Sequence, residues 1–193
     1  MLETSGASGM GGGSVGFSVL ANTSSAPRSG TLAIAGLQFT VNQAGGNAEA
    51  VTSDSVSPSS GSGASQTFTL TYSDTNGAAD LAYVQAAFNS TLSGVAACDV
   101  YVVPASGAIY LANAAYSAWS LPLTLGSAGT LQNSQCAINV GASSGVLSGN
   151  IYTLKLAITF QSGFTGAKNL YGYASQTIGN LNSGWQTLGT WTP

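Results

Sequence analysis

The fold is decided by the stretch Ile151-Tyr152-Thr153-Leu154-Lys155-Leu156-Ala157-Ile158-Thr159-Phe160. Every second residue from Tyr152 to Phe160 is large and apolar, whereas Thr, Lys and Ala stand between them. Successive side chains of a β-strand point to opposite faces of the sheet, so this period of two predicts a strand with one buried face. Lys155 is then expected on the outward face.

The same alternation recurs along the chain at intervals of about ten residues, a spacing typical of β-sandwiches and barrels. In 67–72, Phe68, Leu70 and Tyr72 alternate with threonines. Residues 80–88 are the best candidate for a helix, and they fit a strand almost as well. The sequence therefore predicts an all-β, antiparallel fold. The further candidate strands are 98–103, 108–112, 120–125, 135–140, 168–174 and 185–191.

The two cysteines, Cys98 and Cys136, fall within candidate strands. Each shares one face with the apolar residues two and four positions later, so both side chains are expected to point inward. A disulfide between them would tie two layers together and close a loop of about 38 residues, worth roughly 3–4 kcal/mol in the chain-entropy model. The lack of charge clusters, the abundant Thr and Ser and the β-rich pattern predict a secreted, extracellular or cell-surface protein, and a disulfide is the expected state in such an oxidising setting.

Composition excludes several functions. Only 5% of the 193 residues are charged, the net charge is −3, and there is no His. Nucleic acids and anionic membranes need a basic patch, which three Lys and Arg residues cannot supply. The Ser-His-Asp and Cys-His arrangements are impossible, so we expect no enzyme and no cofactor. No apolar run is long enough for membrane insertion. Residues 1–5 do not resemble a signal peptide, so we expect either a removed signal or a piece of a longer protein.

Three parts are predicted along the chain. Residues 1–46 form a partial β module of three strands, at 15–21, 31–35 and 37–42, after a Gly-rich loop over 5–13. Residues 47–66 are rich in Gly and Ser and are predicted to be a linker, with the domain boundary near 48. Residues 67–193 form the β-sandwich domain.

Two resemblances add to this division. The stretch Gly13-Ser14-Val15-Gly16-Phe17-Ser18-Val19-Leu20-Ala21-Asn22-Thr23, with Arg28 to Gln43, resembles the C-terminal half of a BACON-type domain, an Ig-like module of bacterial surface proteins, over residues 4–45. Residues 50–193 resemble, more loosely, Ig-like repeat modules of large bacterial secreted and surface proteins. Those modules often carry Asp where Gln176 stands. The resemblances imply an Ig-like antiparallel sandwich with an additional partial Ig-like module.

The partial module suggests the first function. Three strands with open edges can pair with a neighbouring chain. We therefore expect a homo-oligomer or polymer: a non-enzymatic structural subunit that assembles into a surface fibre or filament by strand pairing between subunits. The residues expected on the assembly strands are Val15, Phe17, Val19, Leu32, Ile34, Phe39 and Val41.

A second hypothesis is a metal site in the segment Asp74-Thr75-Asn76-Gly77-Ala78-Ala79-Asp80. Asp74, Asn76 and Asp80 supply hard oxygen atoms around a glycine turn, as calcium loops do. The alternative is an ordinary connecting turn, because Asp-x-Asn-Gly is also common turn chemistry.

The aromatic residues suggest the alternative function, a carbohydrate-binding or adhesion module of a larger cell-surface protein. Trp and Tyr beside Asn and Gln can stack on sugar rings, although the same residue types also fill cores and interfaces. The candidates for glycan stacking are Trp119, Trp185 and Trp191, with tyrosines such as Tyr101, Tyr110, Tyr116, Tyr171 and Tyr173.

Overall fold

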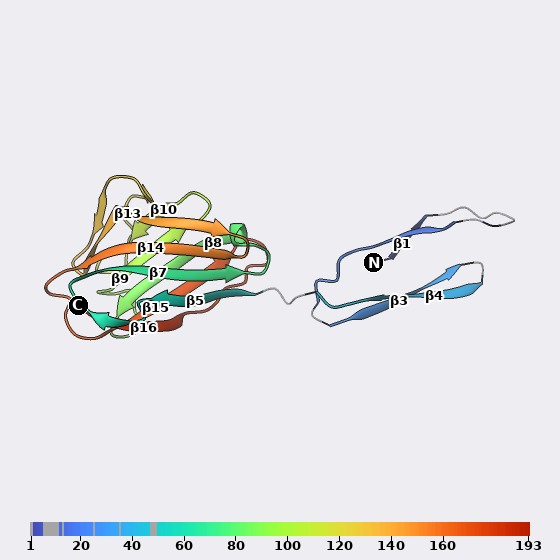
Figure 1. Cartoon of the computed structure of the whole chain (residues 1–193), viewed down its shortest axis with the longest axis horizontal. Coiled ribbons are helices and arrows are strands. Elements are labelled where there is room, and N and C mark those ends of the chain that lie inside the picture. The colour runs from blue at the N-terminus through green and yellow to red at the C-terminus, as the bar shows by residue number, and fades with distance from the viewer. Residues whose placement is uncertain (1, 6–11, 13, 25, 35, 47–49) are drawn as a thin grey trace. The chain divides into compact units, whose positions relative to one another are not determined.

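The computed structural model describes residues 2–5, 12, 14–24, 26–34, 36–46 and 50–193. The chain divides into two compact units, Met1–Glu49 and Ala50–Pro193 (Figure 1). Both are built from strands, and a single 3-10 turn, η1 (Ala78–Asp80), is the helical element among the described residues. The all-β prediction is confirmed. Within the described part of the chain, no helix has the length and apolar character needed to cross a membrane.

Seven strands make the larger sheet of the C-terminal unit. They are β11 (Leu123–Thr124), β10 (Ala108–Leu111), β9 (Cys98–Val103), β8 (Leu81–Asn89), β15 (Lys168–Gln176), β16 (Gln186–Thr192) and β6 (Ser60–Ser62), in that spatial order. Neighbours are antiparallel except β16 and β6, which are parallel. The ambiguous segment 80–88 is therefore a strand from Leu81 onwards, as part of β8.

Five strands make the second sheet. They are β12 (Thr130–Gln132), β13 (Cys136–Ser148), β14 (Ile151–Phe160), β7 (Ser65–Asp74) and β5 (Val51–Ser57), in that order. The central strand β14 has the bounds that the alternation predicts, and its apolar residues from Tyr152 to Phe160 are buried while Lys155 is exposed. One face of this sheet is therefore covered by another layer, and the other face is open to solvent.

The two sheets share one hydrophobic core. Phe68 of β7 and Phe160 of β14 come from one sheet and Phe88 of β8 from the other, and their ring centroids lie 4.9 to 6.4 Å apart. The predicted disulfide is also confirmed: Cys98 of β9 and Cys136 of β13 join the sheets with an S–S distance of 2.00 Å. This arrangement is compatible with a β-sandwich.

The predicted linker over 47–66 is wrong from residue 50 onwards, because β5, β6 and the start of β7 lie there. Composition predicted a linker here because β6 contains only Ser and Gly. Its one glycine, Gly61, is needed for packing, because a Cβ there would collide with the Trp191 ring. The Trp191 Nε1 also donates a hydrogen bond of 2.8 Å to the Gly63 carbonyl. Residues 47–49 lie outside the described residues.

The N-terminal unit has four described strands, not the three predicted. β1 (Leu2–Ser5) pairs with β2 (Gly16–Val19), and β3 (Arg28–Ile34) pairs with β4 (Leu37–Gln43), each pair antiparallel. Alternation missed β1 because it is short and polar. Most of the loop expected over 5–13, and Ala35 of the hairpin, lie outside the described residues. Arg28 links the pairs by donating hydrogen bonds to the Leu20 carbonyl and to Gln43.

Candidate functional site

The outward face of the seven-stranded sheet carries aromatic side chains in register. Cys98, Val100 and Val102 of β9 point into the core, so Asp99 and Tyr101, which alternate with them, point outward. Tyr101 is paired with Tyr110 of β10 on one side and with Gln85 of β8 on the other. Gln85 is in turn paired with Tyr173 of β15. Strand pairing thus places these residues in one row.

The row belongs to a connected group that we call the aromatic strip. Its rings touch in sequence across the sheet: Tyr83 stacks on Tyr101 at 4.8 Å and on Tyr173 at 5.8 Å between centroids. Trp119 lies 5.5 Å from Tyr101 at one end, and Trp185 lies 5.4 Å from Tyr173 at the other. All members are half-buried or exposed. The strip consists of Tyr83, Tyr101, Tyr110, Tyr116, Trp119, Tyr173 and Trp185.

Most of the aromatic residues proposed for glycan stacking lie in this strip, with two exceptions. Trp191 is 5% exposed and packs edge-on against Phe68 in the core, so the prediction for Trp191 is wrong. Tyr171 is buried, and its hydroxyl accepts a hydrogen bond from Asn169. Sequence reasoning missed Tyr83, which shares the outward face with Gln85 in the strand β8.

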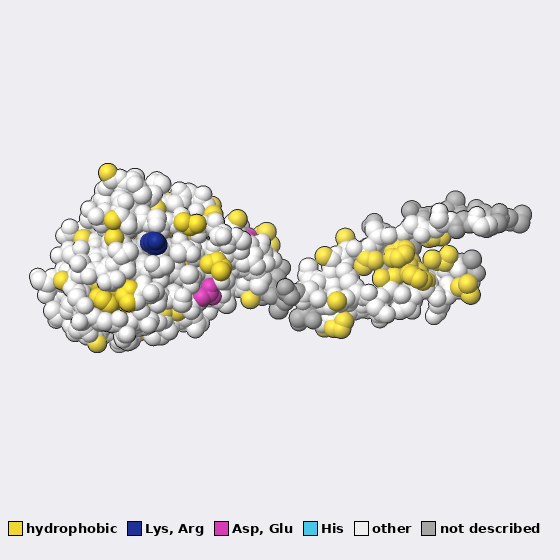
Figure 2. All heavy atoms as spheres, viewed as in Figure 1, with side chains coloured by type: hydrophobic (Ala, Val, Ile, Leu, Met, Phe, Trp, Pro, Cys, Tyr) yellow, Lys and Arg dark blue, Asp and Glu magenta, His cyan; other side chains and the backbone are white. Residues whose placement is uncertain are grey.

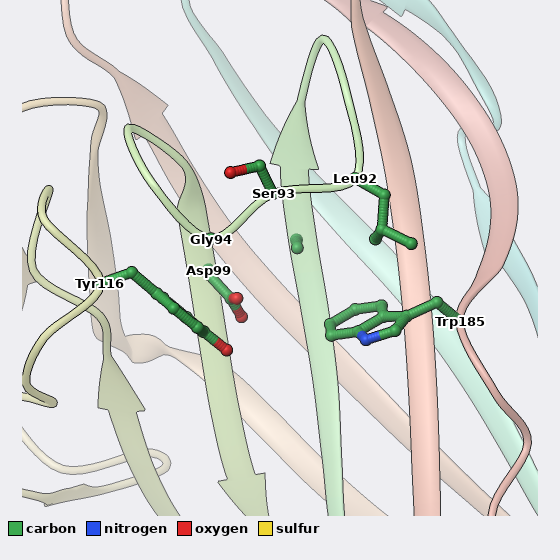
Figure 3. Close-up of a pocket in the computed structure, with 7 residues that line it drawn as sticks. Leu92, Ser93, Gly94, Asp99, Tyr116 and Trp185 are labelled. Atoms are coloured by element: carbon green, nitrogen blue, oxygen red, sulfur yellow. The ribbon is translucent and has the colours of Figure 1, made fainter.

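A pocket of about 160 Å³ opens beside the strip. Asp99 lies at its base, on the same outward face as Tyr101, and is 1% exposed. Figure 3 shows its carboxylate between the rings of Tyr116 and Trp185. Two members of the aromatic strip therefore form walls of the pocket. The lining residues are Ala87, Leu92, Ser93, Gly94, Asp99, Tyr116 and Trp185.

Two loops fix Tyr116 in this position. Tyr116 has a φ of 54°, which is sparsely populated by residues with a bulky side chain. Its ring packs directly on Gly94, where a Cβ atom would collide with it. The loops are tied together by the Ala96 amide, which donates a hydrogen bond of 2.8 Å to the Ala114 carbonyl. The pocket wall is therefore preformed.

Burial controls the electrostatics of the pocket. Burial of the Asp99 carboxyl group away from water raises its pKa to about 7. Its Oδ1 atom has no hydrogen-bond partner among the described residues. Burial also raises the pKa of Tyr116, and the nearby Asp99 carboxylate adds to that increase. Sequence reasoning missed Asp99, although an acidic residue between Cys98 and Val100 in an apolar strand was a signal.

The candidate calcium ligands lie in two turns. The Asp74 carboxylate accepts a hydrogen bond of 2.7 Å from the Asn76 amide, as in an Asx turn. Asp80 accepts one of 3.1 Å from the Ile178 amide. No cluster of three or more His, Cys, Asp or Glu side chains suited to a metal occurs in the described part of the chain. The turn alternative accounts for these hydrogen bonds.

The residues expected on the assembly strands lie in β2, β3 and β4, or just before β2 in the case of Val15. Of these, Leu32 is buried, whereas Val15, Phe17 and Phe39 are exposed. The rings of Phe17 and Phe39 are 5.8 Å apart, which brings β2 beside the β3–β4 hairpin. Val19, Ile34 and Val41 are half-buried.

Comparison with known proteins gives no match: no family model, no curated protein and no solved structure matches the chain. The resemblances of residues 4–45 to BACON-type domains and of residues 50–193 to Ig-like surface modules therefore stay predictions.

Proposed function

We propose that the C-terminal unit is a non-enzymatic carbohydrate-binding module and that the aromatic strip is its binding face. Tyr and Trp combine a large apolar ring with a polar atom, which suits the alternating CH and OH groups of a sugar. The strip runs from β10 to Trp185, just before β16, about 19 Å at the usual strand spacing. That length favours an oligosaccharide over a single sugar.

The members of the strip have different roles in this proposal. Tyr83 is stacked on both sides by Tyr101 and Tyr173, so these three rings present mainly edges and hydroxyl groups. Trp119 and Trp185 are tilted against their neighbours by 53° and 42° and lie at the ends. We assign stacking on sugar rings to the tryptophans and hydrogen bonding to the tyrosine hydroxyls.

The surroundings of the strip favour an uncharged or cationic glycan over a nucleic acid. Single-stranded nucleic acids also stack on aromatic side chains, but their phosphates need a basic groove. Lys155 lies on the other sheet, and the Lys168 ammonium lies over the Phe164 ring and donates to the Thr165 carbonyl.

An extracellular location belongs to the same proposal. The disulfide between Cys98 and Cys136 is typical of secreted proteins. It joins two facing sheets, as the conserved bridge of Ig domains does, and this supports an Ig-like sandwich as the finer fold class.

Substitution of Trp119 or Trp185 by alanine tests this function. A glycan array identifies the ligand, and calorimetry with the full chain measures its affinity. Each substitution is expected to weaken binding by about 10- to 30-fold, as loss of an aromatic anchor does. The matched control is Leu147→Ala, which truncates a similarly exposed side chain on the other sheet. Absence of any glycan ligand, or unchanged affinity in both tryptophan variants, would contradict the proposal.

A second function, self-assembly into a fibre or filament, is favoured by the N-terminal unit. Among its described residues only Asn22 and Leu32 are buried, whereas Phe17, Leu37 and Phe39 are 42, 76 and 49% exposed. Figure 2 shows apolar side chains gathered on this unit. Contiguous exposed apolar surface marks interaction sites, and short sheets with open edges accept further strands. We propose a second copy of the chain as the partner.

The double substitution Phe17→Ser with Phe39→Ser tests assembly. Wild-type chain is expected to elute as large species and to give regular fibres in negative-stain micrographs, while the variant remains monomeric because the apolar surface is lost. Light scattering after size exclusion measures the mass. The control Ile178→Ser changes a 64% exposed residue of the C-terminal unit and should assemble normally. A monomeric wild type at all concentrations would end the assembly proposal.

A further inference from the structure

The carboxylate of Asp99 is buried without a cationic partner. Its exposed fraction is 1%, and Oδ1 accepts no hydrogen bond from the described residues. A buried carboxylate is costly unless it is paired or hydrogen-bonded. The pocket above it, flanked by Tyr116 and Trp185, is open to an external group (Figure 3).

No basic side chain in the described part of the chain lies in the Asp99 pocket. The three basic residues of the chain are Arg28, Lys155 and Lys168. Arg28 donates hydrogen bonds to Leu20, Ala21 and Gln43 within the N-terminal unit. Lys155 is exposed on β14 of the opposite sheet, and no basic side chain lines the pocket. A cation that pairs with the ionised form of Asp99 therefore would come from a ligand.

We propose that the Asp99 pocket binds a primary ammonium group of the glycan, so that the ligand class is a polymer or oligomer containing 2-amino-2-deoxy sugars. This inference rests on the proposed carbohydrate-binding function. A carboxylate offers an ammonium a charge-assisted hydrogen bond, and the rings of Tyr116 and Trp185 add cation–π attraction. A volume of about 160 Å³ fits a small head group.

The pocket and the aromatic strip form one continuous binding surface. Trp185 and Tyr116 belong to both, and Asp99 precedes Tyr101 by two residues on the same outward face. A sugar stacked on Trp185 can therefore place a substituent in the pocket. Gly94 and the positive φ of Tyr116 hold the wall in place before the ligand arrives, which reduces the entropy cost of binding.

An ammonium and a neutral substituent would change the titration of the site in different ways. With a pKa of about 7, Asp99 is mostly protonated at pH 6. A bound cation stabilises the ionised form and expels the proton, whereas a hydroxyl or acetamido group does not. Burial raises the pKa of Tyr72 on the core side and of Tyr116 across the pocket, and the Asp99 carboxylate adds to both increases. Both therefore stay neutral.

Three β-1,4-linked hexamers test the inference, because glucose, N-acetylglucosamine and glucosamine differ only at C2. Calorimetry with the full chain at pH 6 in buffers of different ionisation enthalpy gives affinity and proton release. We expect the glucosamine hexamer to bind about tenfold more tightly than the other two, with release of about one proton. In Asp99→Asn the preference and the proton release should disappear. Asp54→Asn, the same charge change at an exposed residue of β5, should keep both.

The possible outcomes separate the two proposals. Equal binding of the three hexamers by wild-type chain would overturn the ammonium pocket and leave carbohydrate binding intact. The ammonium pocket would also be overturned if Asp54→Asn lost the preference for the glucosamine hexamer. Attraction between the net charges of protein and ligand would then explain that preference. Binding of a lysine-containing peptide, with no hexamer bound, would overturn both proposals.

Discussion

Replacing both half-cystines, Cys98→Ala with Cys136→Ala, is expected to lower the free energy of unfolding of the C-terminal unit by about 4 kcal/mol. The disulfide closes a loop with a sequence separation of 38 residues, and the chain-entropy model gives this magnitude for such a loop. Both residues are fully buried, and the bridge joins β9 to β13 across the core. The total free energy of unfolding of a native protein is only about 5–15 kcal/mol, so a loss of this size is a large fraction of the stability.

Urea unfolding followed by tryptophan fluorescence measures this effect, because Trp191 lies in the core next to Phe68. Wild-type chain unfolded with and without a reductant provides the matched comparison, since reduction breaks the same bond without changing a side chain. Both the variant and the reduced protein should unfold at lower urea concentration. Unchanged midpoints would show that the native contacts between the sheets, and not the cross-link, determine stability.

Strands with a clear apolar period could be predicted from the sequence, and those without it could not. β14 and β7 alternate because they lie between other strands and bury one face in the core. β5 and β6 lie at the edges of the two sheets, where small and polar residues suffice. Their Ser and Gly content reads as a linker, although Val51 and Val56 of β5 are buried. Pairing with a partner strand is not encoded in local composition.

The site could be predicted by residue type but not by position. Trp119 and Trp185 are exposed or half-buried on the strip, whereas Trp191 fills the core, and nothing in the local sequence separates the three. The members of the strip are brought together by the register of strand pairing, which places Tyr101, Gln85 and Tyr173 in one row. Residue type alone does not contain this register. The place of Asp99 in an apolar strand was a signal in the sequence, but its burial was not, because that arises from two loops that fold over the sheet.

Replacing Asp99 with asparagine is expected to stabilise the unliganded C-terminal unit at pH 8 by about 4 kcal/mol and to leave it nearly unchanged at pH 4. Burial raises the pKa of Asp99 from 3.8 to about 7. The folded state therefore binds the proton more tightly than the unfolded state, and its stability is highest below pH 4. That stability is lost as the pH rises to about 7, and each unit of pKa difference corresponds to about 1.4 kcal/mol. Asparagine does not titrate and removes this loss.

Urea unfolding at intervals between pH 4 and pH 8 measures the difference, and Asp54→Asn should keep the wild-type loss of stability because Asp99 is still present. A free energy of unfolding of the wild-type chain that rises with pH over this range would contradict the buried, unpaired state of Asp99.

The two effects of Asp99→Asn are opposite in sign: the unliganded protein gains stability at neutral pH, and the preference for the amino sugar is lost. A carboxylate that destabilises the fold and improves one interaction is typical of a residue kept for binding. Saturating glucosamine hexamer at pH 7 should therefore raise the melting temperature of wild-type chain more than that of the variant.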